Sequence, residues 1–244
     1  MKIFFNGVGD AFSKQSYNTS FIVQSNGYNL LVECPHPLFK ILAERKQEKP
    51  EWPDIDDING IYISHLHGDH MNGLEGYAFY KKFVKGQPVD LYVPYYYADM
   101  IWDHRLRTSM ETGIGKDEES ITFPEKFFFN KEKVYPDSYH DIGPFIISIK
   151  QTKHHMPSFA IIIDDGNKSV GYSSDTKFDM SLMKWLSNAD LIIHESNYGP
   201  GHTNWNDLNS LEKNIRNKMI LVHLPDNFDA GAIAKAEDGM ILEV

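Results

Sequence analysis

The sequence predicts an α/β protein in which two β-sheets carry helices on their outer faces. Short runs rich in Ile, Val, Phe and Tyr recur along the chain, and Gly, Pro, Asn or Asp bounds most of them, which is typical of strands. Runs with a helical spacing of apolar residues alternate with these strands. The strand-like runs outnumber the helical runs and cluster in two halves of the chain, which indicates two sheets.

The predicted strands are shared between the two halves of the chain. In the first half they are Ile3–Phe5, Thr19–Gln24, Leu30–Glu33, Gly60–Ser64 and Val89–Val93. In the second half they are Phe145–Gln151, Phe159–Asp164, Ser169–Ser173, Leu191–His194 and Met219–His223. The turn Asp165-Gly166-Asn167 predicts a β-hairpin, because Asp-Gly is a preferred pair in tight turns.

Helical spacing of apolar residues marks a second set of segments. These are Pro37–Lys46, Gly73–Val84, Tyr95–Thr108, Asp179–Leu186 and Trp205–Asn217. The segment around 109–139 is the least regular part of the chain, and we expect an insertion or a long loop there. A length of 244 residues is sufficient for one buried core, so we expect residues 1–244 to form a single domain.

Composition excludes several classes of protein. The formal net charge is -10, so the chain has no global field that would attract nucleic acid, and no stable nucleic-acid partner is expected. A single cysteine, Cys34, allows no intrachain disulfide and fits a reducing cytoplasm. No run approaches the roughly 20 apolar residues of a membrane span, and the N-terminus is too polar for a signal sequence. We therefore expect a cytoplasmic protein.

The run from His65 to His70, His-Leu-His-Gly-Asp-His, follows directly on an apolar strand. On an extended segment, residues two apart point the same way, so His65 and His67 can face one ion. Gly68 permits a sharp turn, after which Asp69 and His70 can face a second point nearby. Imidazole and carboxylate are ligands suited to Zn²⁺, Mn²⁺ or Fe. The run therefore predicts a metal centre rather than a set of solvated surface histidines.

Six residues cannot complete two coordination shells, so further ligands are expected downstream. Metal-capable residues follow four predicted strands, and the ends of neighbouring strands can meet at one edge of a sheet. They are His154-His155, Asp175, His194-Glu195 and His223.

In these residues the chain resembles the metallo-β-lactamase fold family. The resemblance extends over nearly the whole chain and includes Gly7–Ser13, Asn18–Ser20, Leu31–Cys34 and Ser173–Thr176. It implies a four-layer αββα sandwich and a site for two Zn²⁺ ions, with Mn²⁺ as the alternative metal. It also implies the ligands of the first ion (His65, His67 and His154), those of the second ion (Asp69, His70 and His223) and a bridging Asp175. His155 remains the alternative third ligand of the first ion, although the spacing to Phe159 favours His154.

The late part of the chain resembles one branch of this family. The lactamase branch uses a late cysteine as a ligand, whereas the only cysteine here, Cys34, comes far too early. A bridging aspartate such as Asp175 is typical of the phosphodiesterase, glyoxalase-II-like and flavo-diiron branches. The run Leu191–Ser196, followed by Gly201-His202-Thr203, is similar to elements of the RNase Z branch. This similarity implies that His202 protonates the leaving oxygen and that Glu195 holds His202. In the mechanism that we expect, Asp69 accepts a hydrogen bond from the attacking water. His194 is expected to pack beneath the site.

The flexible basic arm with which RNase Z clamps tRNA has no counterpart here. The expected insertion is acidic instead, since it contains Glu111, Asp117, Glu118, Glu119 and Glu125. A tRNA substrate is therefore disfavoured.

A closer resemblance comes from Gly73–Tyr80, Tyr92–Pro94 and Ile101–Arg107, which are similar to the anti-Pycsar phosphodiesterases of phages and bacteria. It implies hydrolysis of cyclic CMP and cyclic UMP, and also of cyclic AMP and cyclic GMP, to 5′ monophosphates. Such an enzyme would counteract antiphage signalling, in the host cytoplasm if a phage encodes it. The resemblance also implies a homodimer in which a loop of one subunit approaches the active site of the other.

A cyclic nucleotide needs a cation beside its phosphate, and Arg105, Arg107 and Lys153 are the candidates. Its base needs an aromatic face. The candidate rings are Tyr95–Tyr97, Trp102, Phe127–Phe129, Tyr135 and Tyr139. The alternatives to this function are an RNase Z-like or other small phosphodiester hydrolase, a thioester hydrolase of the glyoxalase type, and a non-catalytic protein that sequesters nucleotides.

Overall fold

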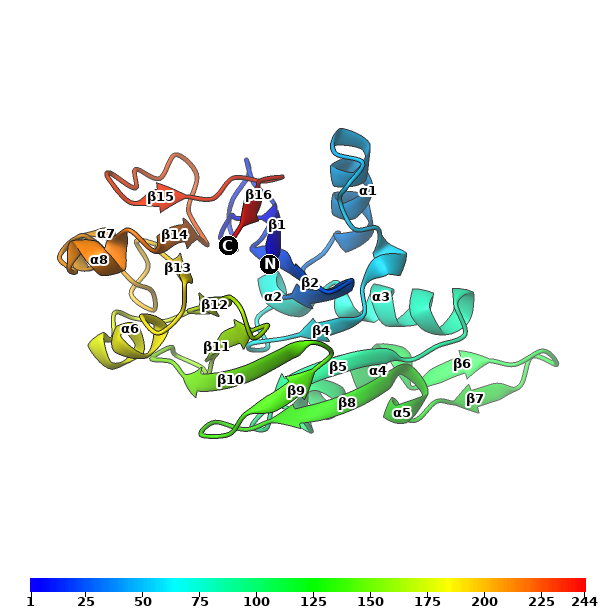
Figure 1. Cartoon of the computed structure of the whole chain (residues 1–244). Coiled ribbons are helices and arrows are strands. Elements are labelled where there is room, and N and C mark those ends of the chain that lie inside the picture. Colours follow the sequence, from blue (N-terminus) through cyan, green and yellow to red (C-terminus); the bar gives the residue numbers. More distant parts are fainter.

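The computed structural model describes residues 1–244 and contains two seven-stranded sheets with helices on their outer sides (Figure 1). This arrangement confirms the predicted αββα fold class. All ten predicted strands are present, and the Asp165–Asn167 turn joins two antiparallel strands as expected.

The first sheet comes from the first half of the chain, completed by one C-terminal strand. Its order is β16-β1-β2-β3-β4-β5-β8, and the strands from β3 to β8 run parallel. The bounds are β1 (Lys2–Gly7), β2 (Ser20–Ser25), β3 (Tyr28–Val32), β4 (Gly60–Tyr62), β5 (Val89–Pro94), β8 (Phe129–Val134) and β16 (Ile241–Glu243).

The second sheet has the order β15-β14-β13-β12-β11-β10-β9, and its strands from β12 to β15 run parallel. The bounds are β9 (His140–Ile142), β10 (Phe145–Gln151), β11 (Phe159–Asp164), β12 (Ser169–Tyr172), β13 (Leu191–Glu195), β14 (Met219–Val222) and β15 (Ala234–Lys235). The parallel strands of each sheet place their carboxyl ends at one edge, and the predicted site residues follow those ends.

Helices cover the outer faces of the two sheets (Figure 1). On the side of the first sheet these are α1 (Leu38–Glu48), α2 (Gly68–Met71), α3 (Leu74–Phe79), the π-helical η2 (Tyr80–Val84), η3 (Ile101–Leu106) and α4 (Arg107–Met110), with the short 3-10 turn η1 (Ile55–Asp57). On the side of the second sheet they are α6 (Met180–Leu186), α7 (Trp205–Asn209) and α8 (Lys213–Arg216). The single helix predicted over 205–217 is thus two helices, because Glu212 is extended between them. None of the helices has the length and apolar character that crossing a membrane requires.

The segment expected to be an irregular insertion contains several regular elements. The strands β6 (Thr112–Ile114) and β7 (Ser120–Thr122) form a hairpin that projects from the body of the molecule (Figure 1). Helix α5 (Glu125–Phe128) then leads into β8, the edge strand of the first sheet. Because β8 is an edge strand, only two of its residues are buried, so its sequence lacks the apolar signal of the other strands.

One core of 48 buried residues joins the inner faces of both sheets. Within it the rings of Phe21 and Tyr172 pack edge to face with 5.1 Å between their centroids. The hydroxyl of Tyr62 donates to the backbone oxygen of Phe159 across the sheets at 3.1 Å. A second cluster of 13 residues lies between the second sheet and helices α6 to α8. The two sheets are therefore held at a fixed separation, which positions the site at their common edge.

Candidate metal centre

The motif loop lies between β4 and α2. Helix α2 begins directly after His67, so Asp69 and His70 lie in its first turn. A Cβ at Gly68 would lie 2.5 Å from Nδ2 of the Asn72 side chain, so a larger residue there would displace the Asn72 side chain. Arg105 of η3 donates to the backbone oxygen of Leu66 at 2.7 Å and to the side chain of Asn72 at 3.0 Å. Local turn geometry and Arg105 thus fix the loop.

The predicted ligands of the first ion converge on one point. His65 Nε2 lies 2.9 Å from His67 Nδ1. Asp175 Oδ2 lies 3.7 Å from both His65 Nε2 and His154 Nε2. A tetrahedral Zn²⁺ with ligands at about 2.0–2.1 Å separates neighbouring ligand atoms by about 3.3–3.4 Å. The observed separations of 2.9 and 3.7 Å lie on either side of this value, so small shifts of the four side chains would accommodate such an ion.

The predicted ligands of the second ion form an adjacent group. Asp69 Oδ2 lies 3.2 Å from His223 Nε2 and 3.4 Å from His70 Nε2. Asp175 Oδ1 lies 3.4 Å from His70 Nε2 and 3.6 Å from His223 Nε2. The two oxygens of Asp175 thus face different groups, which is the arrangement of a bridging carboxylate.

Unpaired buried atoms support a fit to metal ions. Buried atoms of His70, His154, Asp175 and His223 have no hydrogen-bond partner. Leaving such groups unpaired is costly, since a buried polar atom without a partner keeps its full desolvation penalty. A donor set of five imidazoles and two carboxylates fits a pair of Zn²⁺ or Mn²⁺ ions. Such ions would satisfy His70 Nε2, His154 Nε2 and Asp175 Oδ1, which face into the two ligand groups.

His154 and His155 occupy different environments. The Nε2 atom of His154 faces Asp175, and its Nδ1 lies 2.9 Å from the backbone oxygen of Gly201. His155 is exposed, and its ring packs on His67 with 4.6 Å between the centroids. His154 therefore belongs to the group that could hold the first ion, and His155 lies at its rim.

A buried network behind the ligands was not found from the sequence. The hydroxyl of Ser64 donates to Glu33, receives a hydrogen bond from Ser174 at 2.6 Å, and lies 3.0 Å from His65 Nδ1. Because a hydroxyl has one proton to donate, His65 Nδ1 must be the donor, which leaves Nε2 free for an ion. Glu33 also lies 3.3 Å from His70 Nδ1. One buried carboxylate thus supports one histidine of each group.

Three of the seven non-glycine residues with a positive φ lie at the same edge of the sheets. Glu33, Ser174 and His223 have φ values of 64°, 51° and 57°, in the left-handed region that non-glycine residues rarely adopt. Each of them directly follows, or lies two residues after, the end of a parallel strand. Such strain accumulates where the surrounding structure fixes functional groups. This is a signal that the sequence does not reveal.

Glu195 and His202 form a pair at the mouth of the centre. Glu195, the last residue of β13, is buried, and its Oε1 accepts from the backbone N–H of Thr176 at 2.7 Å. The same oxygen lies 3.0 Å from His202 Nδ1, and the His202 ring stacks on His223 at 5.2 Å. His202 Nε2 makes no hydrogen bond within the protein. His194 is buried beneath, with burial lowering its pKa to about 4.

The two ligand groups differ in their protonation. Burial lowers the pKa of His67 to about 4 and that of His65 well below its ordinary value, so these rings are neutral. Burial also acts to lower the pKa of His223, but the charge of Asp175 and the hydrogen bond to Asp69 outweigh it and raise the pKa to about 9. For His202, burial is likewise outweighed by the hydrogen bond and charge of Glu195, which raise its pKa. Binding of cations would displace the proton of His223.

The three cations expected at the phosphate each have a partner within the protein. Arg105 holds the motif loop, and Arg107 pairs with Glu111 at 2.8 Å. Lys153 pairs with Asp179 at 3.2 Å, but its side chain is exposed and lines a pocket with His154 and His155. Among the expected aromatic residues, Tyr97, Trp102, Phe128 and Phe129 are buried in the core.

Comparison with known proteins identifies the family of the chain and confirms its fold. The family model described as Anti-Pycsar protein Apyc1 matches residues 1–243. The chain is 32% identical over 243 residues to the anti-Pycsar protein Apyc1 of Bacillus phage 010DV004, and the alignment covers 94% of this chain and 91% of the relative. It is 28% identical over 232 residues to the anti-Pycsar protein Apyc1 of Paenibacillus xerothermodurans, and this alignment covers 91% of this chain and 87% of the relative.

Solved structures share the architecture. The metallo-beta-lactamase fold protein YhfI from Bacillus subtilis superposes with a TM-score of 0.75 at 21% identity, covering 99% of this chain and 98% of that one. The short form of human tRNase Z superposes with a TM-score of 0.72 at 20% identity, covering 100% and 99%. These likenesses establish the metallo-β-lactamase fold.

Proposed function

Because the chain belongs to the Anti-Pycsar protein Apyc1 family, we propose that its metal centre hydrolyses cyclic mononucleotides to 5′ monophosphates. The proposed substrates are cyclic CMP and cyclic UMP, and also cyclic AMP and cyclic GMP. In this role the protein counteracts cyclic-nucleotide signalling against phages, as the name of its relatives suggests.

The observation that carries this proposal is the division of the Asp175 carboxylate between two groups of side chains, with an acid–base pair beside them. The proposed ligands are His65, His67 and His154 for one ion and Asp69, His70 and His223 for the other. When bound, two such ions supply Lewis acidity and charge neutralisation for a phosphodiester and lower the pKa of water.

The residues of the chain have distinct tasks in the proposed reaction. Asp69 lies at the edge of its group with a side chain 12% exposed, so its carboxylate can accept a hydrogen bond from the attacking water. Glu195 holds His202 through Nδ1, which leaves Nε2 directed away from this pair. The raised pKa of His202 keeps a proton on the ring, and Nε2 gives this proton to the 3′ oxygen as it leaves.

The acidic hairpin β6–β7 supports a small substrate over RNA. It carries Asp117, Glu118 and Glu119 at its tip, which would repel a phosphate backbone. We further propose that residues 1–244 act as one domain and that the protein is a homodimer in the cytoplasm, and light scattering of the purified protein tests the dimer.

The decisive experiment incubates the purified protein with cyclic CMP, UMP, AMP and GMP, with and without a chelator. We expect 5′ monophosphates that chelation abolishes and that added Zn²⁺ or Mn²⁺ restores. Nucleotide that is bound but not hydrolysed by the metal-loaded protein would contradict the proposal and favour sequestration. Cleavage of precursor tRNA or of a thioester, without cleavage of cyclic nucleotides, would assign the centre to another branch of the fold.

A further inference from the structure

Two loops beside the metal centre each present an exposed aromatic ring. Phe12, in the loop between β1 and β2, is 87% exposed, and Tyr198, in the loop between β13 and α7, is 67% exposed. Isolated exposed apolar side chains are common on protein surfaces. The position and the rigidity of these two loops decide whether the rings have a function.

The loop of Phe12 is anchored on both sides of the ring. The buried Asp10 accepts from the backbone N–H of Phe12 at 3.0 Å, and the hydroxyl of Ser13 donates to Asp226 at 2.6 Å. The backbone N–H of Asp10 also donates to the oxygen of Leu224 at 3.1 Å, one residue after the ligand candidate His223. The ring is therefore held in solvent by a fixed loop beside the second ligand group.

The loop of Tyr198 is fixed to the same residue. Asn197 donates from its side chain to the second oxygen of Asp10 at 2.8 Å and accepts from the backbone N–H of Tyr198 at 2.6 Å. Asp10 thus joins the two loops directly. The Tyr198 ring also packs on Phe228, with 5.3 Å between the ring centroids.

The Tyr198 loop continues directly into the proposed proton donor. The backbone N–H of His202 donates to the oxygen of Gly199 at 3.1 Å. A Cβ on Gly199 would lie 3.0 Å from Cδ2 of the His202 ring, so the backbone after Tyr198 packs on that ring. The two exposed rings therefore flank the His202 and His223 side of the centre.

We propose that Phe12 and Tyr198 form a nucleobase-binding subsite of this centre, an inference that rests on the proposed function. With the phosphate at the ion ligands and the 3′ oxygen at His202, the ribose directs its base outward on the side of these loops. Aromatic faces stack on every base without hydrogen bonds, so this subsite accepts pyrimidines and purines alike. Stacking also removes the two exposed rings from water.

Steady-state kinetics of Phe12→Ala and Tyr198→Ala test this subsite. Loss of a stacking face should raise KM for all four cyclic nucleotides by about 5- to 100-fold, with little change in kcat, since the rings act in binding. The conservative variant Tyr198→Phe should keep the KM of the unsubstituted protein. Abasic ribose 3′,5′-cyclic phosphate, which has no base to stack, should be hydrolysed equally by all variants.

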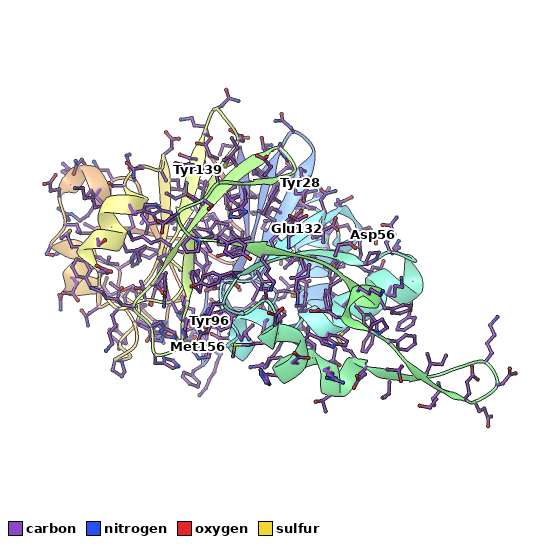
Figure 2. All side chains as sticks on the ribbon, turned by 90° about the horizontal axis from the view of Figure 1, so that it is seen from below. Tyr28, Asp56, Tyr96, Glu132, Tyr139 and Met156 are labelled. Carbon is purple, nitrogen blue, oxygen red and sulfur yellow. The ribbon has the colours of Figure 1, made fainter.

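Ile114→Ala is the matched control, because Ile114 is 82% exposed on the projecting β6–β7 hairpin and has no assigned role at the site. Its removal should leave KM unchanged. Tyr139 is 82% exposed, and Figure 2 shows it apart from Met156, which follows His154 and His155, so this expected ring is not part of the proposed subsite. Unchanged KM in Phe12→Ala and Tyr198→Ala, with an active unsubstituted protein, would overturn the subsite and leave the proposed function intact. A changed oligomeric state with unchanged KM would assign the rings to a subunit interface instead, whereas an inactive unsubstituted protein would refute the proposed function itself.

Discussion

The two sheets contribute to the metal centre in different ways. The first sheet supplies a contiguous run, His65–His70, whose geometry is set by one strand end and one helix start. The second sheet supplies Asp175, Glu195 and His223, which come from the ends of three neighbouring parallel strands. Ligand spacing in the first case is a property of the local chain, whereas in the second it depends on strand order and register.

This difference extends to the side chains behind the ligands. In the first sheet, Glu33 and Ser64 form a buried network that faces His65 and His70. In the second sheet, the buried Glu195 instead faces His202, which lies at the mouth of the site. In the proposed reaction the first sheet therefore holds metal ligands, and the second sheet also serves proton transfer.

The largest effect is expected from Asp175→Asn, which changes the carboxylate whose two oxygens face different ligand groups. Each ion contributes several kcal/mol to stabilising the transition state. We therefore expect less than two ions per chain by mass spectrometry and a loss of turnover of more than about 10⁴-fold. If this variant bound two ions and kept normal turnover, the motif of the first sheet and the histidines would be sufficient for metal binding and catalysis without a bridging carboxylate.

A smaller effect is expected from His202→Ala, which separates proton transfer from metal binding. Loss of a general acid should lower kcat by roughly 10²–10⁴-fold. The metal content should stay that of the unsubstituted protein, because Glu195 and His202 lie outside the proposed ligand set. Substrates with a good leaving group, such as a nitrophenyl diester, should lose much less activity, since such a group leaves without a proton. Equal losses on both kinds of substrate would contradict the role of His202.

The sequence could predict the parts of the site that local patterns encode. The motif His65–His70 is recognisable because spacing and chemistry coincide within a few residues, and Asp175 and His223 because each follows an apolar strand. The network of Glu33 with Ser64 was missed, because a buried carboxylate at a left-handed residue carries no local signal. Arg105 was expected at the phosphate, but it donates to the backbone oxygen of Leu66. The sequence does not show which backbone oxygen accepts from a guanidinium group.

The same limit explains the elements that the fold prediction missed. The edge strands β8 and β9 carry charged residues and lack strict alternation, as the Lys131–Lys133 stretch of β8 shows. An edge strand has only one neighbour in the sheet, and its pairing with that neighbour fixes its position. For β8 this neighbour is β5 (Val89–Pro94). Tertiary pairing, rather than local propensity, therefore produces these strands.

Ser64→Ala and Glu33→Gln test the buried support of the first sheet. Residues that orient ligand histidines change metal affinity by about 10–100-fold when they are replaced. Ser64 lies 3.0 Å from His65, so Ser64→Ala should weaken one ion, whereas Glu33→Gln should weaken both, because Glu33 also lies near His70. Competition with a chromophoric chelator measures each affinity. Ser169→Ala, which removes a buried hydroxyl bonded to Asp190 at the far end of β12, is the control and should bind both ions normally. Equal behaviour of all three variants would refute this support.

The smallest effect is expected from Arg105→Ala, which tests whether the first-sheet motif relies on a contact outside itself. Arg105 donates to the Leu66 oxygen between two proposed ligand histidines, but the Arg105 side chain is exposed, so water can replace much of the interaction. We expect Tm to fall by about 2–4 °C and metal affinity to fall only severalfold. Arg107→Ala is the matched control, since Arg107 pairs with Glu111 on an exposed helix surface and should leave Tm and metal affinity unchanged. If both variants behaved alike, the strand and the helix of the motif would hold its geometry without Arg105. Ligand spacing in the first sheet would then depend on the local chain alone, in contrast to the second sheet, where it depends on strand order and register.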